Sequence, residues 1–159
     1  MNKPHLLLGV TLAWAFASIC AAQTSTSSTT TTTSGGSTAP YTEGPVWTIT
    51  MVKTKPGMED DYLKNLAQGF RATNEEAKKQ GLIMDYKILI GNAATPQDFN
   101  ILLMAEYKNM AALDNARDKF DPIATKIIGN EDAQRQGSIK RMEIREIMGG
   151  KLMREITLK

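Results

Sequence analysis

The 159-residue sequence almost lacks two residue types on which many enzyme sites depend. Its only histidine is His5 and its only cysteine is Cys20. Both lie in an N-terminal segment that we expect to be removed on export. A mature domain without them can form no disulfide, thiolate nucleophile, Cys/His zinc site, histidine-based serine triad or proximal haem ligand. The composition therefore predicts no metal and no cofactor, and it excludes several large classes of enzyme.

An excess of charge of one sign is also missing. The chain has 19 basic and 17 acidic residues, and removal of Lys3 with the N-terminal segment would leave the two signs nearly equal. No basic block with interleaved aromatic residues is present. The sequence therefore predicts no nucleic-acid partner.

The first 22 residues have the features of a secretory signal peptide. Lys3 supplies a positive charge, residues 6–19 form an apolar run, and Cys20-Ala21-Ala22 provides the small residues that signal peptidase accepts. We expect cleavage near Ala22 and an exported protein, either periplasmic or secreted. The apolar run is shorter than the ~20 residues of a spanning helix, so no membrane span is expected after cleavage. Lipid anchoring through Cys20 is the alternative, but Ile19 stands where lipoprotein signals have a small residue.

The Ser/Thr-rich segment at residues 23–40 is predicted to be a disordered linker. It contains no large apolar side chain before Tyr41, so burial cannot offset its chain entropy. Its hydroxyl groups are candidate glycosylation sites, although a simple spacer is the plainer interpretation. The remaining residues, 41–159, are enough for one domain with its own hydrophobic core.

This domain begins with a strand, a tight turn and an amphipathic helix in direct succession. Residues 46–55 are rich in β-branched side chains and alternate in two sets, and Pro56-Gly57 ends the strand. Glu59, Asp60 and Asp61 then place negative charge in the first turn of a helix whose apolar residues recur at helical spacing. Gly81 is expected to end that helix.

Two strands are expected next, at residues 82–90 and 99–107, joined as a hairpin by a turn-rich loop. Asn109 is then predicted to cap a second helix. Asp121-Pro122 is expected to interrupt that helix, with a fresh helical start that runs to Gly129.

The C-terminal part is predicted to be mostly strand. Asn130 would cap only a short turn, and residues 138–147 would form the fourth strand. Gly149-Gly150 is expected to make a hairpin-like turn into a C-terminal β extension at residues 152–158, either a fifth strand or an arm.

This order of elements, β-α-β-β-α-β, predicts an α+β, ferredoxin-like fold with an antiparallel sheet and both helices on one face. The other face would be left uncovered, and we expect it to be buried in a homodimer. The residues expected on that face are Thr48, Thr50, Val52, Leu89, Leu102 and Met104.

The first strand followed by KPGMEDDYLKNL, in this order of elements, resembles the dimeric α/β-barrel superfamily, which includes antibiotic-biosynthesis monooxygenase-like and stress-responsive barrel proteins. The resemblance covers about residues 46–147 and rests on element order and one turn–helix motif. It implies that two sheets pair into a barrel, with a ligand cavity between sheet and helices. Some members are cofactor-independent oxygenases, some handle haem, and some have no known activity. The histidines that many of the enzymes use have no counterpart here, and the C-terminal GGKLMREITLK departs from the minimal pattern.

Two sets of side chains are candidates for a site in such a cavity. Acid–base chemistry would fall to polar strand residues that point away from the main apolar set, and aromatic or sulfur side chains would contact a ligand. Exposed ion pairs and ordinary core packing are the plainer explanations of the two sets. The catalytic candidates are Asp85, Lys87, Glu106, Glu143 and Arg145, and the ligand-binding candidates are Trp47, Tyr86, Tyr107 and Met104.

Three functions fit the sequence. The first, which we favour, is an exported homodimer that binds a small apolar or aromatic molecule between sheet and helices. The second is a cofactor-independent oxygenase or isomerase, in which Asp85, Glu106 or Glu143 would meet an arginine at the cavity. The third is a structural or interaction module carried on the Ser/Thr linker, with a filled core and no cavity.

Overall fold

The computed structural model describes residues 39–159. The expected signal peptide at residues 1–22, with its cleavage site, and the expected linker up to residue 38 lie outside the described residues. Within the described part, none of the helices has the length and apolar character needed to cross a membrane.

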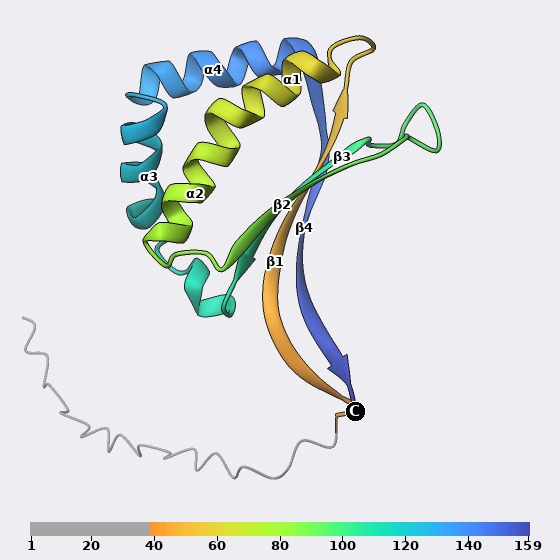
Figure 1. Cartoon of the computed structure of the whole chain (residues 1–159), viewed down its shortest axis with the longest axis vertical. Helices are drawn as coiled ribbons and strands as arrows, with labels where there is room; N and C mark the ends of the chain where they lie inside the picture. Colours follow the sequence, from red (N-terminus) through yellow and green to blue (C-terminus); the bar gives the residue numbers. More distant parts are fainter. Residues whose placement is uncertain (1–38) are drawn as a thin grey trace, which may run out of the picture. The chain divides into compact units, whose positions relative to one another are not determined.

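The chain forms one four-stranded antiparallel sheet with its helices on one side (Figure 1). The strand order is β2-β3-β1-β4. This is the β-α-β-β-α-β order of a ferredoxin-like α+β fold, so the predicted fold class is confirmed, and the sheet of the single chain is not closed into a barrel. The elements are β1 (Tyr41–Thr54), α1 (Glu59–Leu66), the π-helix η1 (Ala67–Arg71), α2 (Ala72–Lys79), β2 (Asp85–Ile90), β3 (Ile101–Tyr107), the 3₁₀ helix η2 (Met110–Leu113), α3 (Ala116–Ile127), α4 (Glu131–Ile144) and β4 (Arg145–Leu158).

The pairing of β1 with β3 decides which side chains lie under the helices. Val52 pairs with Ile101 and Val46 with Tyr107, and all four are buried. Val52 and Ile101 pack with Tyr62 of α1 in one core cluster.

The alternate residues of β1, which are Trp47, Ile49 and Met51, therefore face the open side of the sheet. The expectation that Thr48, Thr50 and Val52 lie on the open face is wrong. Alternation separated the two sets of residues correctly, but it does not say which set the helices cover.

The first helical stretch, from α1 through η1 to α2, begins and ends as predicted. Glu59, Asp60 and Asp61 occupy its first turn. At its end Gly81 has a φ of 70°, and the Leu82 N–H donates to the Ala77 carbonyl over 2.9 Å, which is the 6→1 bond of a Schellman motif. The π segment η1 in the middle of this stretch was not predicted.

Pro122 does not break its helix, contrary to the prediction. It lies inside α3, which runs from Ala116 to Ile127. Phe120, Ile123 and Ile127 lie on one side of α3 and pack on the same core cluster. Burial of this apolar side holds the two halves of the helix together although proline removes one backbone hydrogen bond.

The prediction for residues 138–147 is also wrong over most of its length, because α4 extends to Ile144. The Asn130 side chain accepts a hydrogen bond from the Ala133 N–H over 3.0 Å, and Glu131 and Asp132 follow in the first turn. These features start a full helix rather than a short turn. Ile144 at its end packs against the core cluster of Val52.

Gly149 and Gly150 do not form a hairpin turn, because β4 is continuous from Arg145 to Leu158. The register between β1 and β4 shifts between Met51 and Val52. Gly149 lies opposite Met51 with a φ of 153°, and a Cβ added to it would lie 3.2 Å from the Met51 Cε. The glycine therefore serves a bulge and a close approach within the strand.

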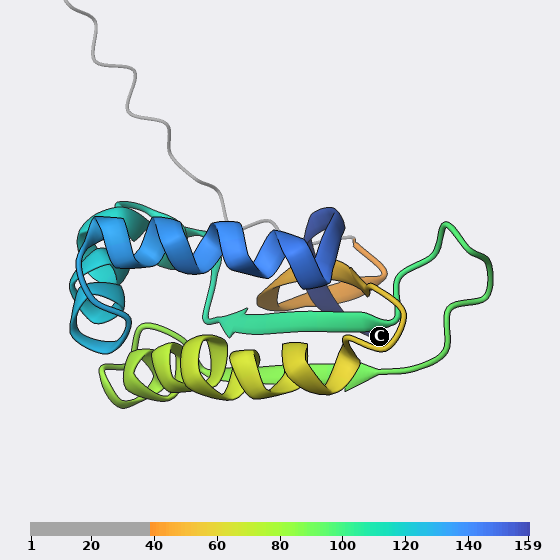
Figure 2. The same cartoon turned by 90° about the horizontal axis from the view of Figure 1, so that it is seen from above.

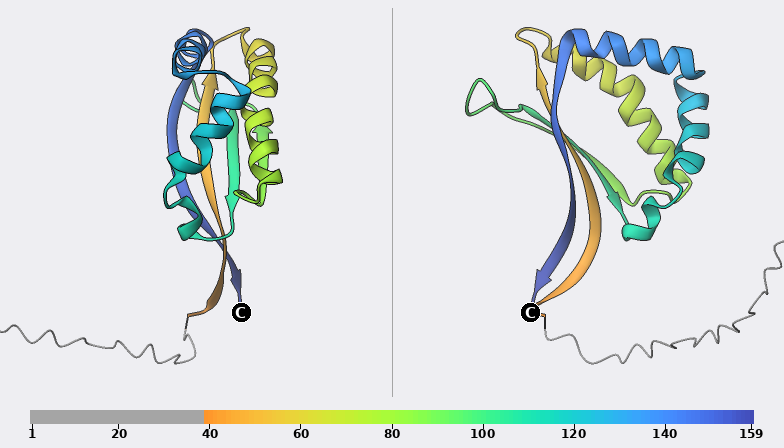
Figure 3. Two further views of the ribbon diagram at one scale, coloured as in Figure 1. Left: turned by 90° about the vertical axis from the view of Figure 1, so that its left-hand side faces the viewer. Right: turned by 180° about the vertical axis from the view of Figure 1, so that it is seen from behind.

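The C-terminal β extension is thus the distal part of β4, and no separate fifth strand exists in residues 39–159. Residues 41–45 of β1 lie beyond the last residue paired with β3. Residues 41–43 pair only with the end of β4, a register shift follows between Glu43 and Val46, and the two strands project together as a ribbon (Figure 3). An ion pair between Glu43 and Arg154 joins the two strands of this ribbon.

The core between sheet and helices consists of two clusters. One lies under α1, and the other lies under α2 and α3. The first contains Val52, Tyr62, Leu66, Ile101 and Leu103, and the second contains Ala77, Ile83, Ala105, Tyr107 and Ile123. Viewed from above, α4 runs alongside the α1–α2 stretch (Figure 2), and the cavity described next opens between these elements.

Candidate functional site

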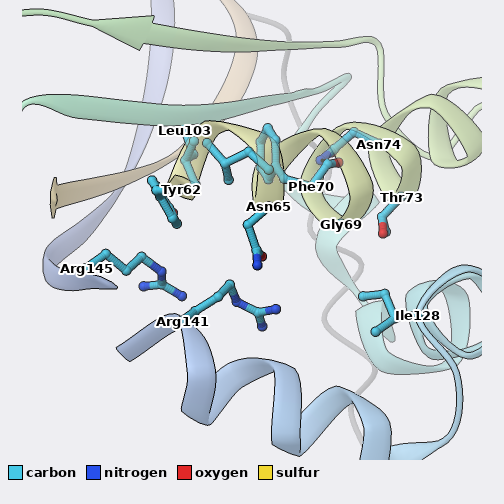
Figure 4. Close-up of a pocket in the computed structure, with 11 residues that line it drawn as sticks. Tyr62, Asn65, Gly69, Phe70, Thr73, Asn74, Leu103, Ile128, Arg141 and Arg145 are labelled. Atoms are coloured by element: carbon cyan, nitrogen blue, oxygen red, sulfur yellow. Dashed lines mark hydrogen bonds between the residues drawn. The ribbon is translucent and has the colours of Figure 1, made fainter. Parts of the chain in front are cut away.

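A cavity of about 270 Å³ lies between the α1–α2 stretch, β3 and the junction of α4 with β4 (Figure 4). Its wall combines apolar side chains, uncharged polar side chains and two arginines. The lining residues are Tyr62, Asn65, Leu66, Gly69, Phe70, Thr73, Asn74, Leu103, Ile128, Arg141 and Arg145.

The apolar part of the wall is formed by Leu66, Phe70, Leu103 and Ile128. Leu66 and Leu103 belong to the first core cluster, against which Phe70 also packs. The Phe70 ring makes an edge-to-face contact with Tyr86, with ring centroids 5.9 Å apart. The contact with Tyr86 of β2 thus fixes one side of the Phe70 ring, while Phe70 also lines the cavity.

The π segment η1 contributes Gly69 and Phe70 to the wall. The Asn74 side chain donates a hydrogen bond of 2.7 Å to the Phe70 carbonyl. A Cβ added to Gly69 would meet nothing within 4 Å. The helix therefore presents a bare patch of backbone to the cavity at Gly69, and π segments of this kind are often found at functional sites.

Arg141 and Arg145 form the charged part of the wall. Arg141 lies in the last turn of α4 and Arg145 is its C-cap. Their four-residue spacing brings both side chains to the same side of the chain, and both extend towards Tyr62 and Asn65 of α1 (Figure 4). The Arg145 guanidinium carbon lies 5.5 Å from the centroid of the Tyr62 ring, a cation–π distance.

The charges in this wall are all of one sign, since the lining includes two arginines and no aspartate or glutamate. Burial lowers the pKa of Arg141, and the neighbouring charge of Arg145 lowers it further. Burial raises the pKa of Tyr62, against the opposing effect of the two arginines. Because arginine stays protonated in proteins, the cavity is positively charged at neutral pH, and the raised pKa leaves Tyr62 a protonated phenol.

Two polar atoms of the wall are buried without a hydrogen-bond partner, the Nε of Arg145 and the Oγ1 of Thr73. Buried polar groups are nearly always paired. Both atoms belong to residues that line the cavity, although the atoms themselves are covered by the surrounding protein.

Only one of the predicted catalytic candidates, Arg145, lines this cavity. Asp85 forms an ion pair of 2.8 Å with Lys78, whose hydrogen bond lowers the pKa of Asp85. Glu106 lies on the open face of the sheet between Trp47 and Asp85 in register, and Glu143 is exposed on α4. The structure thus does not bring the three carboxylates together at the cavity.

The predicted ligand-binding candidates all lie outside the lining of this cavity. Trp47 and Met104 are on the open face, where the Lys87 ammonium lies 4.9 Å from the centroid of the Trp47 ring and Glu155 accepts a hydrogen bond of 3.1 Å from the indole. Tyr86 donates a hydrogen bond of 2.6 Å to Glu75, while Tyr107 is buried in the second core cluster.

Sequence reasoning missed Arg141, Asn65 and Thr73. The signal for Arg141 is its spacing from Arg145, but on the strand expected at residues 138–147 two residues four apart share a face and lie roughly 13 Å from each other, whereas on a helix they are neighbours. Within residues 39–159 no group of three or more His, Cys, Asp or Glu side chains could hold a metal ion.

No protein-family model and no curated protein matches this sequence. Among solved structures, one similar chain is a dimeric protein of unknown function with a ferredoxin-like fold from Bacteroides fragilis NCTC 9343. It is 14% identical, with a TM-score of 0.36, and the match covers 73% of this chain and 97% of the other. The fold assignment given above rests on the order and pairing of this chain's own strands and helices.

Proposed function

We propose that this protein is an exported homodimer that binds a small apolar or aromatic molecule in the cavity between the helices and β3. The observation that carries the proposal is the apolar wall formed by Leu66, Phe70 and Leu103 around a space of about 270 Å³. Small-molecule sites of roughly 300–1,000 Å³ are typical of proteins, and most of them have apolar walls with a few polar groups. The size favours a molecule of one or two rings.

The dimer is proposed from the open face of the sheet, which none of the helices in residues 39–159 covers (Figures 1 and 3). Leu89 is 50% exposed and Met153 is 51% exposed, on strands β2 and β4 at opposite edges of the sheet. A second copy placed on this face would bury both edges and the centre together. The apolar residues that face this side are Trp47, Ile49, Met51, Leu89, Leu102, Met104 and Met153.

Native mass spectrometry of the protein purified from its own host tests all parts of the proposal in one spectrum. We expect a dimer whose chains begin near Gln23 and which carries a reproducible added mass of a small organic molecule. A monomer would contradict the dimer, an intact N-terminus would contradict the cleaved signal peptide, and a bare protein would count against the retained ligand.

A pair of variants tests whether the cavity is the binding site. Gly69→Leu adds a side chain where the cavity wall is open, whereas Ala67→Leu adds a similar side chain at an exposed position of the same π segment. We expect Gly69→Leu to abolish binding of the retained molecule and of N-phenyl-1-naphthylamine, a neutral fluorescent probe. Ala67→Leu is expected to leave both unchanged. Equal binding by the two variants would place the molecule elsewhere.

A further inference from the structure

We propose that the ligand of this cavity is an organic acid whose carboxylate is held by Arg141 and Arg145. The inference deepens the function proposed above and rests on it, because the apolar wall would hold the body of the same molecule. Its basis is the combination of an unpaired cationic end and an apolar end within one cavity.

Arg141 and Arg145 have no acidic partner within residues 39–159. Charged side chains are rarely buried unless they are paired, and Arg141 and Arg145 are both half-buried. None of the ion pairs in residues 39–159 involves either guanidinium. The cavity wall therefore holds two cations that have lost part of their hydration and repel each other. An anion placed against both would relieve the repulsion and replace the lost hydration.

The two guanidinium groups also offer hydrogen-bond donors to the cavity. A guanidinium presents its N–H donors in a planar fork that matches a carboxylate. The Arg145 Nε is buried without an acceptor, the Arg145 side chain lies beneath Tyr62, and the Arg141 guanidinium lies beneath Asn65 (Figure 4). Both arginines line the cavity, so a carboxylate bound between their cavity-facing N–H groups would supply an acceptor and a counter-charge together.

The apolar part of the wall favours an organic acid over a free inorganic anion. The cavity continues from the arginines to Leu66, Phe70 and Ile128, and these side chains offer an inorganic anion no polar contact. A bound acid with an aromatic or aliphatic body would fill both ends. The ligand class is therefore an amphipathic monoacid of one or two rings, rather than phosphate or sulfate.

The test compares acids with their neutral amides, which are nearly identical in shape. Three pairs span the size range: benzoate with benzamide, 2-naphthoate with 2-naphthamide, and indole-3-acetate with indole-3-acetamide. Binding to the full mature chain is measured by protein-observed NMR and calorimetry, up to about 1 mM. We expect at least one acid to bind about tenfold or more tightly than its amide, a preference of about 1.4 kcal/mol.

Arginine variants then locate the charge preference. Arg141→Gln is expected to remove the preference for the acid while the amide binds as before. The matched control is Arg135→Gln on the same helix, whose side chain pairs with Asp132 outside the cavity and whose loss should leave both affinities unchanged. The ligand-free Arg141→Gln protein should melt no lower than the wild type, because removal of one of two like charges relieves repulsion. A large fall in melting temperature would show a structural role for Arg141 and overturn the inference.

The other outcomes of these experiments distinguish the carboxylate site from the small-molecule function on which it rests. Equal binding of acids and amides would leave the small-molecule function standing and overturn the carboxylate site. Arginine-dependent binding of sodium phosphate as tight as that of the best acid would overturn the organic acid in favour of a free anion. No binding by any of the six compounds would overturn both.

Discussion

If the open face of the sheet is the dimer interface, a single charge placed on it should weaken association strongly. Met153 is suited to this test, since it pairs with Trp47 in register on the open face and is 51% exposed in the single chain. In a two-fold dimer, Met153→Glu introduces a carboxylate in each copy. Burying a polar group without a partner costs about 1–3 kcal/mol. The two copies together should lose about 2–6 kcal/mol, and the dissociation constant should rise by about 30-fold to 20,000-fold.

The chain supplies a matched control in Met142, which is 62% exposed on α4. Met142→Glu makes the same chemical change on the helical side of the molecule and should leave the dimer intact. Sedimentation velocity over a concentration series measures the dissociation constant of each variant, and circular dichroism checks that both are folded. A folded Met153→Glu protein that dimerises as tightly as the wild type would refute the assignment of the open face as the interface.

Two further predictions concern stability and can be measured on the same samples. Asn100→Ala should lower the free energy of unfolding by about 2–3 kcal/mol, because the Asn100 side chain makes three hydrogen bonds worth about 1 kcal/mol each. Its partners are the Thr54 N–H, the Thr54 hydroxyl and the Glu59 carboxylate. Urea denaturation measures the loss, with Asn92→Ala in the exposed loop as the control, and a loss below about 1 kcal/mol would contradict the prediction. Burial raises the pKa of Tyr62 in the folded state, so its contribution to stability is complete below its unfolded pKa of about 10 and is lost as the pH rises through the folded pKa. Thermal melts from neutral pH to pH ~11 should therefore show a smaller alkaline decline for Tyr62→Phe than for the wild type, and equal declines would show that Tyr62 does not contribute.

The first half of the domain was predictable because each element there has one clear period. Residues 46–55 alternate with period two, the helix after Pro56-Gly57 repeats with the helical period, and Gly81 provides a stop that its positive φ explains. Neither pattern reports how strands pair. The side of β1 that the helices cover follows from long-range contacts, such as Val52 with Tyr62, and these were not available from local sequence.

The C-terminal third misled because its apolar residues fit two periods. Ile139 and Met142 are three residues apart, as in a helix, whereas Met142 and Ile144 alternate, as in a strand. Gly137 weakens the helical signal, although α4 runs through it.

Because residues 138–147 were expected to form a strand, the pairing of Arg141 with Arg145 at the cavity was not predicted. Arg145 is a candidate from the sequence only because it is a polar residue on an expected strand. Its relation to Arg141 depends on α4 ending where it does, and their approach to Tyr62 depends on α4 packing beside α1, which no local pattern encodes.

The π segment η1 makes the cavity sensitive to chain length as well as to side-chain identity. Residues on an α-helix are separated by about 100° of rotation, so one extra α-helical residue between Leu66 and Ala72 would turn the two flanking helices against each other by about that angle. Tyr62 of α1 and Thr73 of α2 border the same cavity only with the present rotation of α1 relative to α2 about the helix axis. A one-residue insertion after Gln68 would preserve every lining side chain and still separate the aromatic end of the cavity from its Thr73 end.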